Sequence, residues 1–158
     1  METTTRTPFE IQFAIRYGLC LNARHLALYR HLGSLFSGLS LLAGMGAMAS
    51  LIGQTGWLST TVGLLVATVT VLDNQIGPAG RIQCFSEWHA KWSALHQLFV
   101  RNGCEAVING LVELESTHSF TLSGLGKVAY NDAAEELGCD TDSLYKLDLW
   151  PRLLRLFA

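Results

Sequence analysis

Residues 32–72 constrain the fold more than any other part of this chain, because they contain no Lys, Arg, Asp, Glu or His. Two apolar runs, residues 32–51 and 57–72, are separated by a short glycine-containing connection. At a rise of about 1.5 Å per residue, a helix over the first run is about 30 Å long, the thickness of a bilayer's hydrocarbon core. The second run reaches about 24 Å, short of a full span unless residues 73–75 lie at the headgroups or inside a protein-lined assembly. The sequence predicts two transmembrane helices, of which the first is the stronger.

The alternative for this stretch is a helical hairpin buried in a soluble protein. It is disfavoured because a chain of 158 residues seldom buries so many consecutive uncharged residues. The composition agrees: 49% of the residues are hydrophobic and 15% are charged, against about 25% charged in an ordinary soluble domain. Lipid or other subunits must cover this apolar surface, so we expect the bilayer and further copies of the chain as partners.

Charge is distributed unevenly along the chain. Residues 1–31 carry four Arg and two Glu, whereas residues 104–148 carry nine acidic residues and two Lys. Because so acidic a segment repels a phosphate backbone, nucleic acid is not expected as a partner. Basic residues flank the hairpin on both sides and are missing from its tip, so the positive-inside rule places both termini in the cytoplasm. These residues are Arg16, Arg24 and Arg30 before the hairpin and Arg81, Lys91 and Arg101 after it.

The predicted fold is an all-α membrane protein with four segments. A cytoplasmic helix occupies residues 1–31, starting at the capping sequence Thr7-Pro8-Phe9-Glu10. The transmembrane hairpin occupies residues 32–76. A cytoplasmic helix in residues 77–116 follows the hinge at Gly77 and Pro78 and packs on the N-terminal helix. A small C-terminal helical appendage occupies residues 117–158, and its last helix either docks on the cytoplasmic helices or lies at the membrane surface.

Spacing along the helices marks two sets of packing residues. Large apolar side chains at intervals of three and four in residues 77–116 predict a core stripe, and small residues at intervals of four in the hairpin predict close contacts between helices, because helices in lipid associate where backbones approach closely. The core stripe consists of Phe85, Trp88, Trp92, Leu95 and Phe99. The small residues are Gly38, Gly44 and Gly46 in the first run and Ser59, Gly63 and Ala67 in the second.

Asp73 and Asn74 stand at the end of the second run. An acid at the end of a short span is costly unless it faces water, a partner or a pore. Asp73 is therefore either part of a pore mouth or helix contact with Asn74, or already among the headgroups, and the sequence does not choose between these.

The sequence gives no indication of an enzyme, cofactor or metal site. Cys20 with His25 and Cys84 with His89 share an offset of five residues, which separates side chains by about 140° on a helix and is poor for shared ligation. The catalytic motifs GxSxG and HExxH and the phosphate-binding P-loop and GxGxxG patterns are missing.

The order of these features resembles the SLATT proteins, two-transmembrane effectors of bacterial nucleotide-linked defence systems. The matching features are Tyr29-Arg30-His31-Leu32 before a small-residue span, Val71-Leu72-Asp73 at the end of the second, the helix Trp88-His89-Ala90-Lys91-Trp92-Ser93-Ala94-Leu95, and Tyr130-Asn131-Asp132-Ala133-Ala134 before Gly138. The resemblance implies an oligomeric inner-membrane protein of antiviral defence that permeabilises the membrane. It also implies a separate nucleotide-sensing or nucleotide-making partner.

Two other functions remain open at this level. A non-conducting membrane-anchored scaffold would use the acidic residues 104–148 to recruit a partner. A holin-like protein that forms membrane lesions is less favoured, because the cytoplasmic part is larger than that activity requires.

Overall fold

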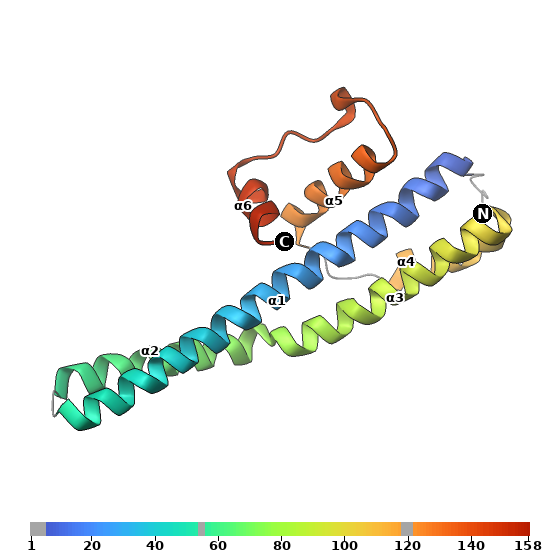
Figure 1. The fold of residues 1–158 in the computed structure, drawn as a ribbon. Helices are drawn as coiled ribbons and strands as arrows, with labels where there is room; N and C mark the ends of the chain where they lie inside the picture. Colours follow the sequence, from blue (N-terminus) through green and yellow to red (C-terminus); the bar gives the residue numbers. More distant parts are fainter. Residues whose placement is uncertain (1–5, 54–55, 118–121) are drawn as a thin grey trace. The chain divides into compact units, whose positions relative to one another are not determined.

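The computed structural model describes residues 6–53, 56–117 and 122–158, with the side chains of 47–53, 56, 58, 59, 141 and 157 outside that set. Over the described residues the chain is helical and contains no strand, which confirms the predicted all-α fold (Figure 1). The elements are α1 (Pro8–Gly53), α2 (Gly56–Ile76), α3 (Pro78–Asn102), the 3-10 helix η1 (Glu105–Val107), α4 (Ile108–Thr117), α5 (Ser123–Glu136), the 3-10 helix η2 (Thr141–Ser143) and α6 (Leu149–Phe157).

The chain divides into two compact units. The terminal unit comprises Met1–Leu28 and Gln83–Ala158, and the hairpin unit comprises Tyr29–Ile82. Each unit contains part of α1 and part of α3, so the unit boundaries differ from the helix boundaries.

The capping sequence at the start of α1 forms the contacts that its residue types predict. The Thr7 hydroxyl accepts a hydrogen bond from the Glu10 N–H at 3.2 Å, and the Glu10 carboxylate accepts one from the Thr7 N–H at 2.7 Å. These two bonds satisfy backbone donors that the first helical turn leaves without partners. The bond from the Thr7 backbone, followed by the bond with its side chain, lowers the pKa of Glu10.

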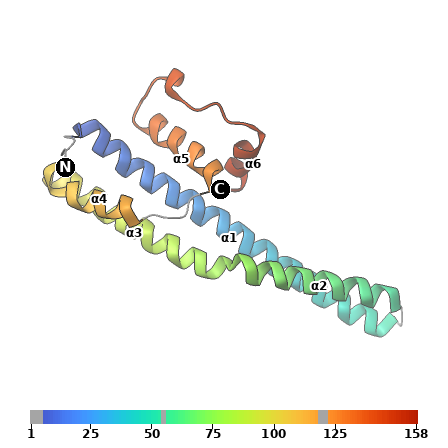
Figure 2. The same cartoon turned by 180° about the vertical axis from the view of Figure 1, so that it is seen from behind.

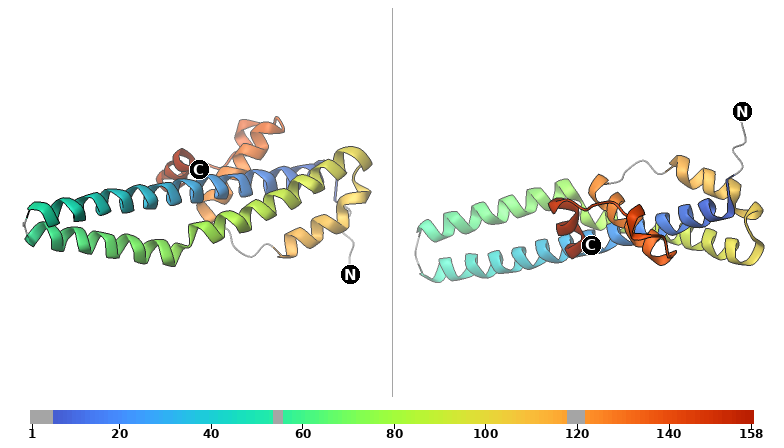
Figure 3. Two further views of the ribbon diagram at one scale, coloured as in Figure 1. Left: turned by 60° about the horizontal axis from the view of Figure 1, so that its bottom comes forward. Right: turned by 90° about the horizontal axis from the view of Figure 1, so that it is seen from above.

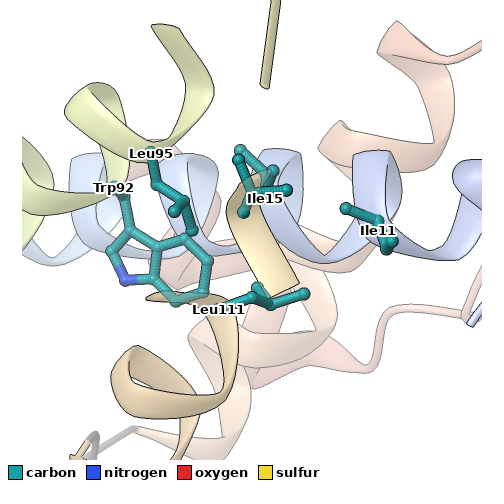
Figure 4. Close-up of a cluster of buried hydrophobic side chains, with 6 residues drawn as sticks. Ile11, Ile15, Trp92, Leu95 and Leu111 are labelled. Carbon is teal, nitrogen blue, oxygen red and sulfur yellow. The ribbon is translucent and has the colours of Figure 1, made fainter. Parts of the chain in front are cut away.

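The core of the terminal unit lies between the first part of α1, α3 and the segment η1 with α4. Figure 4 shows the side chains of α1, α3 and α4 meeting in this cluster. Its buried members are Ile11 and Ile15 of α1, Trp92 and Leu95 of α3, Val107 of η1 and Leu111 of α4. Trp88 and Phe99 pack against the cluster and are partly buried. Four of the five residues of the predicted stripe therefore lie in or against this core.

Phe85, the first residue of that stripe, packs elsewhere in the terminal unit. It is 3% exposed and stacks on the ring of His25, with centroids 4.4 Å apart. This contact joins α3 to α1 at a second point along their length.

The prediction of one helix through residues 77–116 is corrected by the structure. α3 ends at Asn102, and Gly103 adopts a φ of +81°, a conformation that residues with a Cβ rarely take. The Gly103 N–H donates to the Phe99 carbonyl at 2.9 Å, and α4 returns alongside α3 (Figure 3). The reversal brings Val107 and Leu111 into the core, which a continuous helix could not do.

α5 lies on the other side of the first part of α1 from α3 (Figures 1 and 2). It ends at Glu136, and Gly138, two residues later, adopts a φ of +70°, the left-handed conformation that commonly follows a helix. Ion pairs join α1 to α5: Arg24 Nε lies 2.8 Å from Asp132 Oδ2, and Arg16 lies 3.4 Å from Glu136. These pairs join the basic N-terminal segment to part of the acidic C-terminal segment.

α6 docks on α5. Leu154 is 7% exposed, and its Cδ1 approaches the backbone of Gly124 so closely that a Cβ there would lie 2.7 Å from it. Arg155 lies 3.7 Å from Asp132 and 3.6 Å from Glu135, both on α5. These contacts with α5 correspond to docking on the other helices, one of the two placements that the sequence left open for the last helix.

We expect Gly18→Ala to destabilise the terminal unit by about 1–3 kcal/mol, because the added methyl group overpacks the core. A Cβ at Gly18 would lie 2.5–2.6 Å from three carbons of the buried Trp92 ring. Gly80→Ala is the control, since a Cβ at this helical position meets no atom within 4 Å. Thermal unfolding in detergent, followed by circular dichroism, measures both variants. An unchanged midpoint for Gly18→Ala would contradict the contact.

Candidate functional site

The candidate site is the hairpin unit, in which residues 29–53 of α1 lie antiparallel to α2 (Figures 1 and 3). Two glycines of α1 lie at contacts within this unit, one with α2 and one with the first residue of α3, and these contacts define its seam. A Cβ at Gly46 would lie 3.3 Å from Val62, and one at Gly33 would lie 3.9 Å from Pro78. Ala43 and Val69, which are 3% and 5% exposed, are buried in the unit between these two contacts. The hairpin is therefore held by a narrow line of small and β-branched residues.

Most large apolar side chains of the hairpin unit point away from this seam. Leu41 and Leu64 are each 70% exposed. The others on this outer surface are Leu35, Leu39, Leu42, Met45, Trp57, Leu65, Val71 and Leu72. In water, so large an apolar surface would be unfavourable, so it requires an apolar environment or a partner.

Threonines on α2 satisfy their own hydroxyl groups. Thr61, Thr68 and Thr70 each donate a hydrogen bond to the carbonyl oxygen four residues earlier, at 2.8–2.9 Å. A hydroxyl bonded to its own helix needs no water. These exposed polar residues are therefore compatible with apolar surroundings.

One helical stretch among the described residues, Thr60–Asn102, is long and apolar enough to cross a membrane. Only 11% of its most apolar window is buried inside the chain. A core helix of a soluble protein would be mostly buried. The predicted pair of spans goes beyond this finding, and the last part of the first run, residues 47–51, has side chains outside the described set.

The small residues predicted to mediate helix contacts fall into two groups. Gly46 packs in the seam, whereas a Cβ at Gly38, Gly44 or Gly63 would meet no atom within 4 Å. Ala67 is exposed, and the side chain of Ser59 lies outside the described residues. Within one chain, the second group is available for contact with lipid or another copy.

Asp73 and Asn74 are exposed near the end of α2. The helix ends three residues after Asp73, where Gly77 adopts a φ of +56° and donates its N–H to the Asp73 carbonyl at 2.8 Å. Pro78 then starts α3, at a position where its missing N–H costs nothing. Gly77 and Pro78 thus separate two helices at the predicted hinge position.

The terminal unit holds two buried polar residues on α1, His25 and Asn22, that no motif in the sequence marks as functional. His25 is fully buried, donates from Nδ1 to the Leu21 carbonyl at 2.8 Å and accepts the Leu122 N–H at Nε2 at 3.3 Å. Because the carbonyl can only accept and the N–H can only donate, these bonds fix the neutral tautomer. His25 thereby fastens the start of α5 to α1. In the sequence, the buried position of His25 is indicated only by a polar residue among apolar helical positions.

Asn22 is the second buried residue. Its amide nitrogen donates to the Gly18 carbonyl at 2.7 Å, while its oxygen and the Trp92 indole nitrogen are buried with no partner in the described part of the chain. Both residues line a cavity of about 190 Å³, whose other lining residues are Ala14, Tyr17, Gly18, Leu21 and Glu115. The cavity is mostly apolar and has the size of a site for a few waters or a small molecule.

Groups suited to chemistry are sparse in the described residues, where no three His, Cys, Asp or Glu side chains gather as metal ligands. The thiol of Cys20 is partly buried, and its sulfur lies 3.9 Å from the Glu136 carboxylate. Burial and, second, the Glu136 charge raise the pKa of Cys20 to about 11, so the thiol stays protonated and weakly nucleophilic.

Comparison with family models, curated proteins and solved structures gives no match to this chain.

We expect Gly46→Leu to destabilise the hairpin unit by about 1–3 kcal/mol, since the new side chain must displace Val62. Gly63→Leu introduces the same side chain on the paired helix at a position that meets nothing within 4 Å, and should leave the hairpin intact. Disulfide trapping between cysteines introduced at Gly33 and Pro78 would report whether the hairpin remains closed. Equal trapping efficiencies in the two variants would contradict this assignment of the seam.

Proposed function

We propose that the chain is an inner-membrane protein whose residues 32–76 cross the bilayer as a two-helix hairpin, with both termini in the cytoplasm. The observation that carries this proposal is the outward display of uncharged apolar side chains by the hairpin unit. Leu41 on α1 and Leu64 on α2 are each 70% exposed, and residues 32–72 lack any charge. Lipid is the environment that covers such a surface on both helices without requiring a complementary protein.

The proposal extends to self-association of the hairpin. Gly38, Gly44 and Gly63 have open space beside them in the single chain. In lipid, where apolar side chains gain nothing by leaving one apolar environment for another, backbones approach most closely at such residues. These positions support contacts between copies, whereas Gly46 is already used within the chain.

We further propose that the assembled hairpins permeabilise the membrane as an effector of bacterial conflict with phage, switched by a separate nucleotide-sensing or nucleotide-making partner. This part rests on the resemblance to SLATT proteins. The exposed Asp73 and Asn74 at the end of α2 fit a polar pore mouth. Part of the acidic segment that a scaffold would use is already engaged, because Glu115, Asp132 and Glu136 are paired with Arg6, Arg24 and Arg16 of the same chain.

Inducible expression in bacteria with a membrane-potential dye tests the function. We expect the intact chain to depolarise cells and Leu64→Lys to abolish this, because a Lys at the centre of a span costs about 3 kcal/mol on insertion. Val100→Lys is the matched control: Val100 is 69% exposed against 70% for Leu64, but lies in the terminal unit. Depolarisation should persist in the control.

Two other outcomes of this experiment would contradict the proposal. Recovery of the intact chain in the soluble fraction would exclude the membrane hairpin. A membrane-bound chain that leaves the potential intact even with its neighbouring genes expressed would favour the non-conducting scaffold.

Self-association has its own test. We expect Gly63→Leu to lower the mass of the detergent-solubilised assembly by preventing close approach of α2 to another copy, while Val100→Leu, in the terminal unit, should not. Light scattering with correction for bound detergent measures both. An unchanged mass for Gly63→Leu would remove this position from the interface.

A further inference from the structure

The outer face of α6 is apolar and uncovered by the rest of the described chain. Its stripe consists of Leu149, Leu153 and Leu156, which are 80%, 52% and 79% exposed. At 100° per residue these three positions lie within about 60° of one another on the helix surface. Trp150, 65% exposed, lies at one edge of the stripe.

α6 contacts α5 through a different face, which carries Pro151 and Leu154. Leu154 and Pro151 are buried, and Leu154 and Trp150 approach the Gly124 backbone, where a Cβ would lie 2.7 and 3.2 Å from their respective Cδ1 atoms. The three leucines of the stripe point away from these contacts. The attachment to α5 therefore holds α6 in place without covering its most apolar face.

Two arginines lie on one side of the stripe, and Asp148, which directly precedes Leu149, pairs with Lys127 at 3.8 Å. Arg152 lies next to Leu156 on the helix surface, on the side opposite Trp150, and has no ion pair among the described residues. Arg155, one step further round, is held by Asp132 and Glu135 of α5. Leucines between an arginine on one side and a tryptophan on the other are the arrangement of helices that lie in a membrane interface. There the leucines enter the acyl boundary, Arg pairs with lipid phosphate, and Trp sits at headgroup level.

We propose that α6 lies on the cytoplasmic surface of the bilayer, with Leu149, Leu153 and Leu156 in the headgroup and acyl boundary and Arg152 at anionic headgroups. This inference rests on the proposed function, because it requires the chain to be in a membrane. Charge complementarity favours anionic lipid: Arg152 is the charge beside the stripe, whereas the acidic residues near α6 are engaged by Arg155 and by Lys127, which lies 3.8 Å from Asp148.

Asp132 of α5 contacts both α6 and α1 within the terminal unit. Asp132 Oδ1 lies 3.7 Å from Arg155 of α6, while Asp132 Oδ2 lies 2.8 Å from Arg24 of α1. A lipid surface that holds α6 thus acts on the same carboxylate that joins α5 to α1.

Spin-label accessibility in the full chain tests the proposal. The native cysteines are replaced by Ser, and single cysteines are introduced in place of Leu153 or Leu156. Labelled chains are reconstituted in nanodiscs of phosphatidylethanolamine and phosphatidylglycerol. Labels at Leu64 and Val100 provide the lipid and water references, since these residues are 70% and 69% exposed in the two units. We expect residues 153 and 156 to give high collision rates with oxygen and low rates with a nickel chelate, as Leu64 does.

The outcomes separate this proposal from the function on which it rests. Water-like values at Leu64 would overturn the membrane hairpin itself. Lipid-like values at Leu64 with water-like values at 153 and 156 would overturn the placement of α6 alone. Low rates with both reagents at 153 and 156 would mean that a protein, a second copy or another partner, covers the stripe, and would also overturn it.

A second variant tests whether the leucine stripe causes the low collision rate with nickel at residue 153. Leu149→Glu combined with Leu156→Glu puts two charges on the outer face and leaves Leu154 and Arg155 in contact with α5. We expect the nickel collision rate at residue 153 to rise severalfold while the rate at Leu64 stays constant. An unchanged rate at residue 153 would contradict insertion of the stripe into lipid.

Discussion

Burial of the first part of α1 on two sides is the interaction on which the terminal unit depends. One side packs its isoleucines against α3, η1 and α4, and the other pairs its arginines with carboxylates of α5. Apolar packing supplies most of the free energy, because partly exposed ion pairs contribute at most about 1 kcal/mol each. The ion pairs and the His25 contact with Leu122 instead fix where α5 begins and how it lies on α1.

The hairpin unit uses the opposite arrangement. Its seam is narrow, with small residues such as Gly46 and Ala43 allowing close approach, and its large apolar side chains point outward. A soluble helical pair would place its leucines in the seam. The leucines and isoleucines that form the core of the terminal unit point inward, whereas those of the hairpin point outward, and this contrast supports the proposed bilayer around the hairpin.

The position of the hairpin along the chain could be predicted from the sequence, but which of its residues face each other could not. The missing charge in residues 32–72 and the helix break at Gly77 are local properties, readable in the order of residues. Which glycines face the partner helix is different, because it depends on the relative rotation of two helices. Gly44 and Gly46 have equal small size and similar neighbours, yet only Gly46 faces Val62.

The sequence by itself determined the helical class, the cap at Thr7 and Glu10, the helix break at Gly77, and the apolar stripe containing Trp92. Each follows from side-chain and backbone preferences within a few residues. Tertiary structure alone decided the reversal at Gly103, because Gly18 and Gly103 look alike as single glycines, and only the gain from burying Val107 and Leu111 selects the left-handed turn. It also decided the partners of the charged residues, since an arginine and a carboxylate more than 100 positions apart, as are Arg24 and Asp132, meet only when their helices pack.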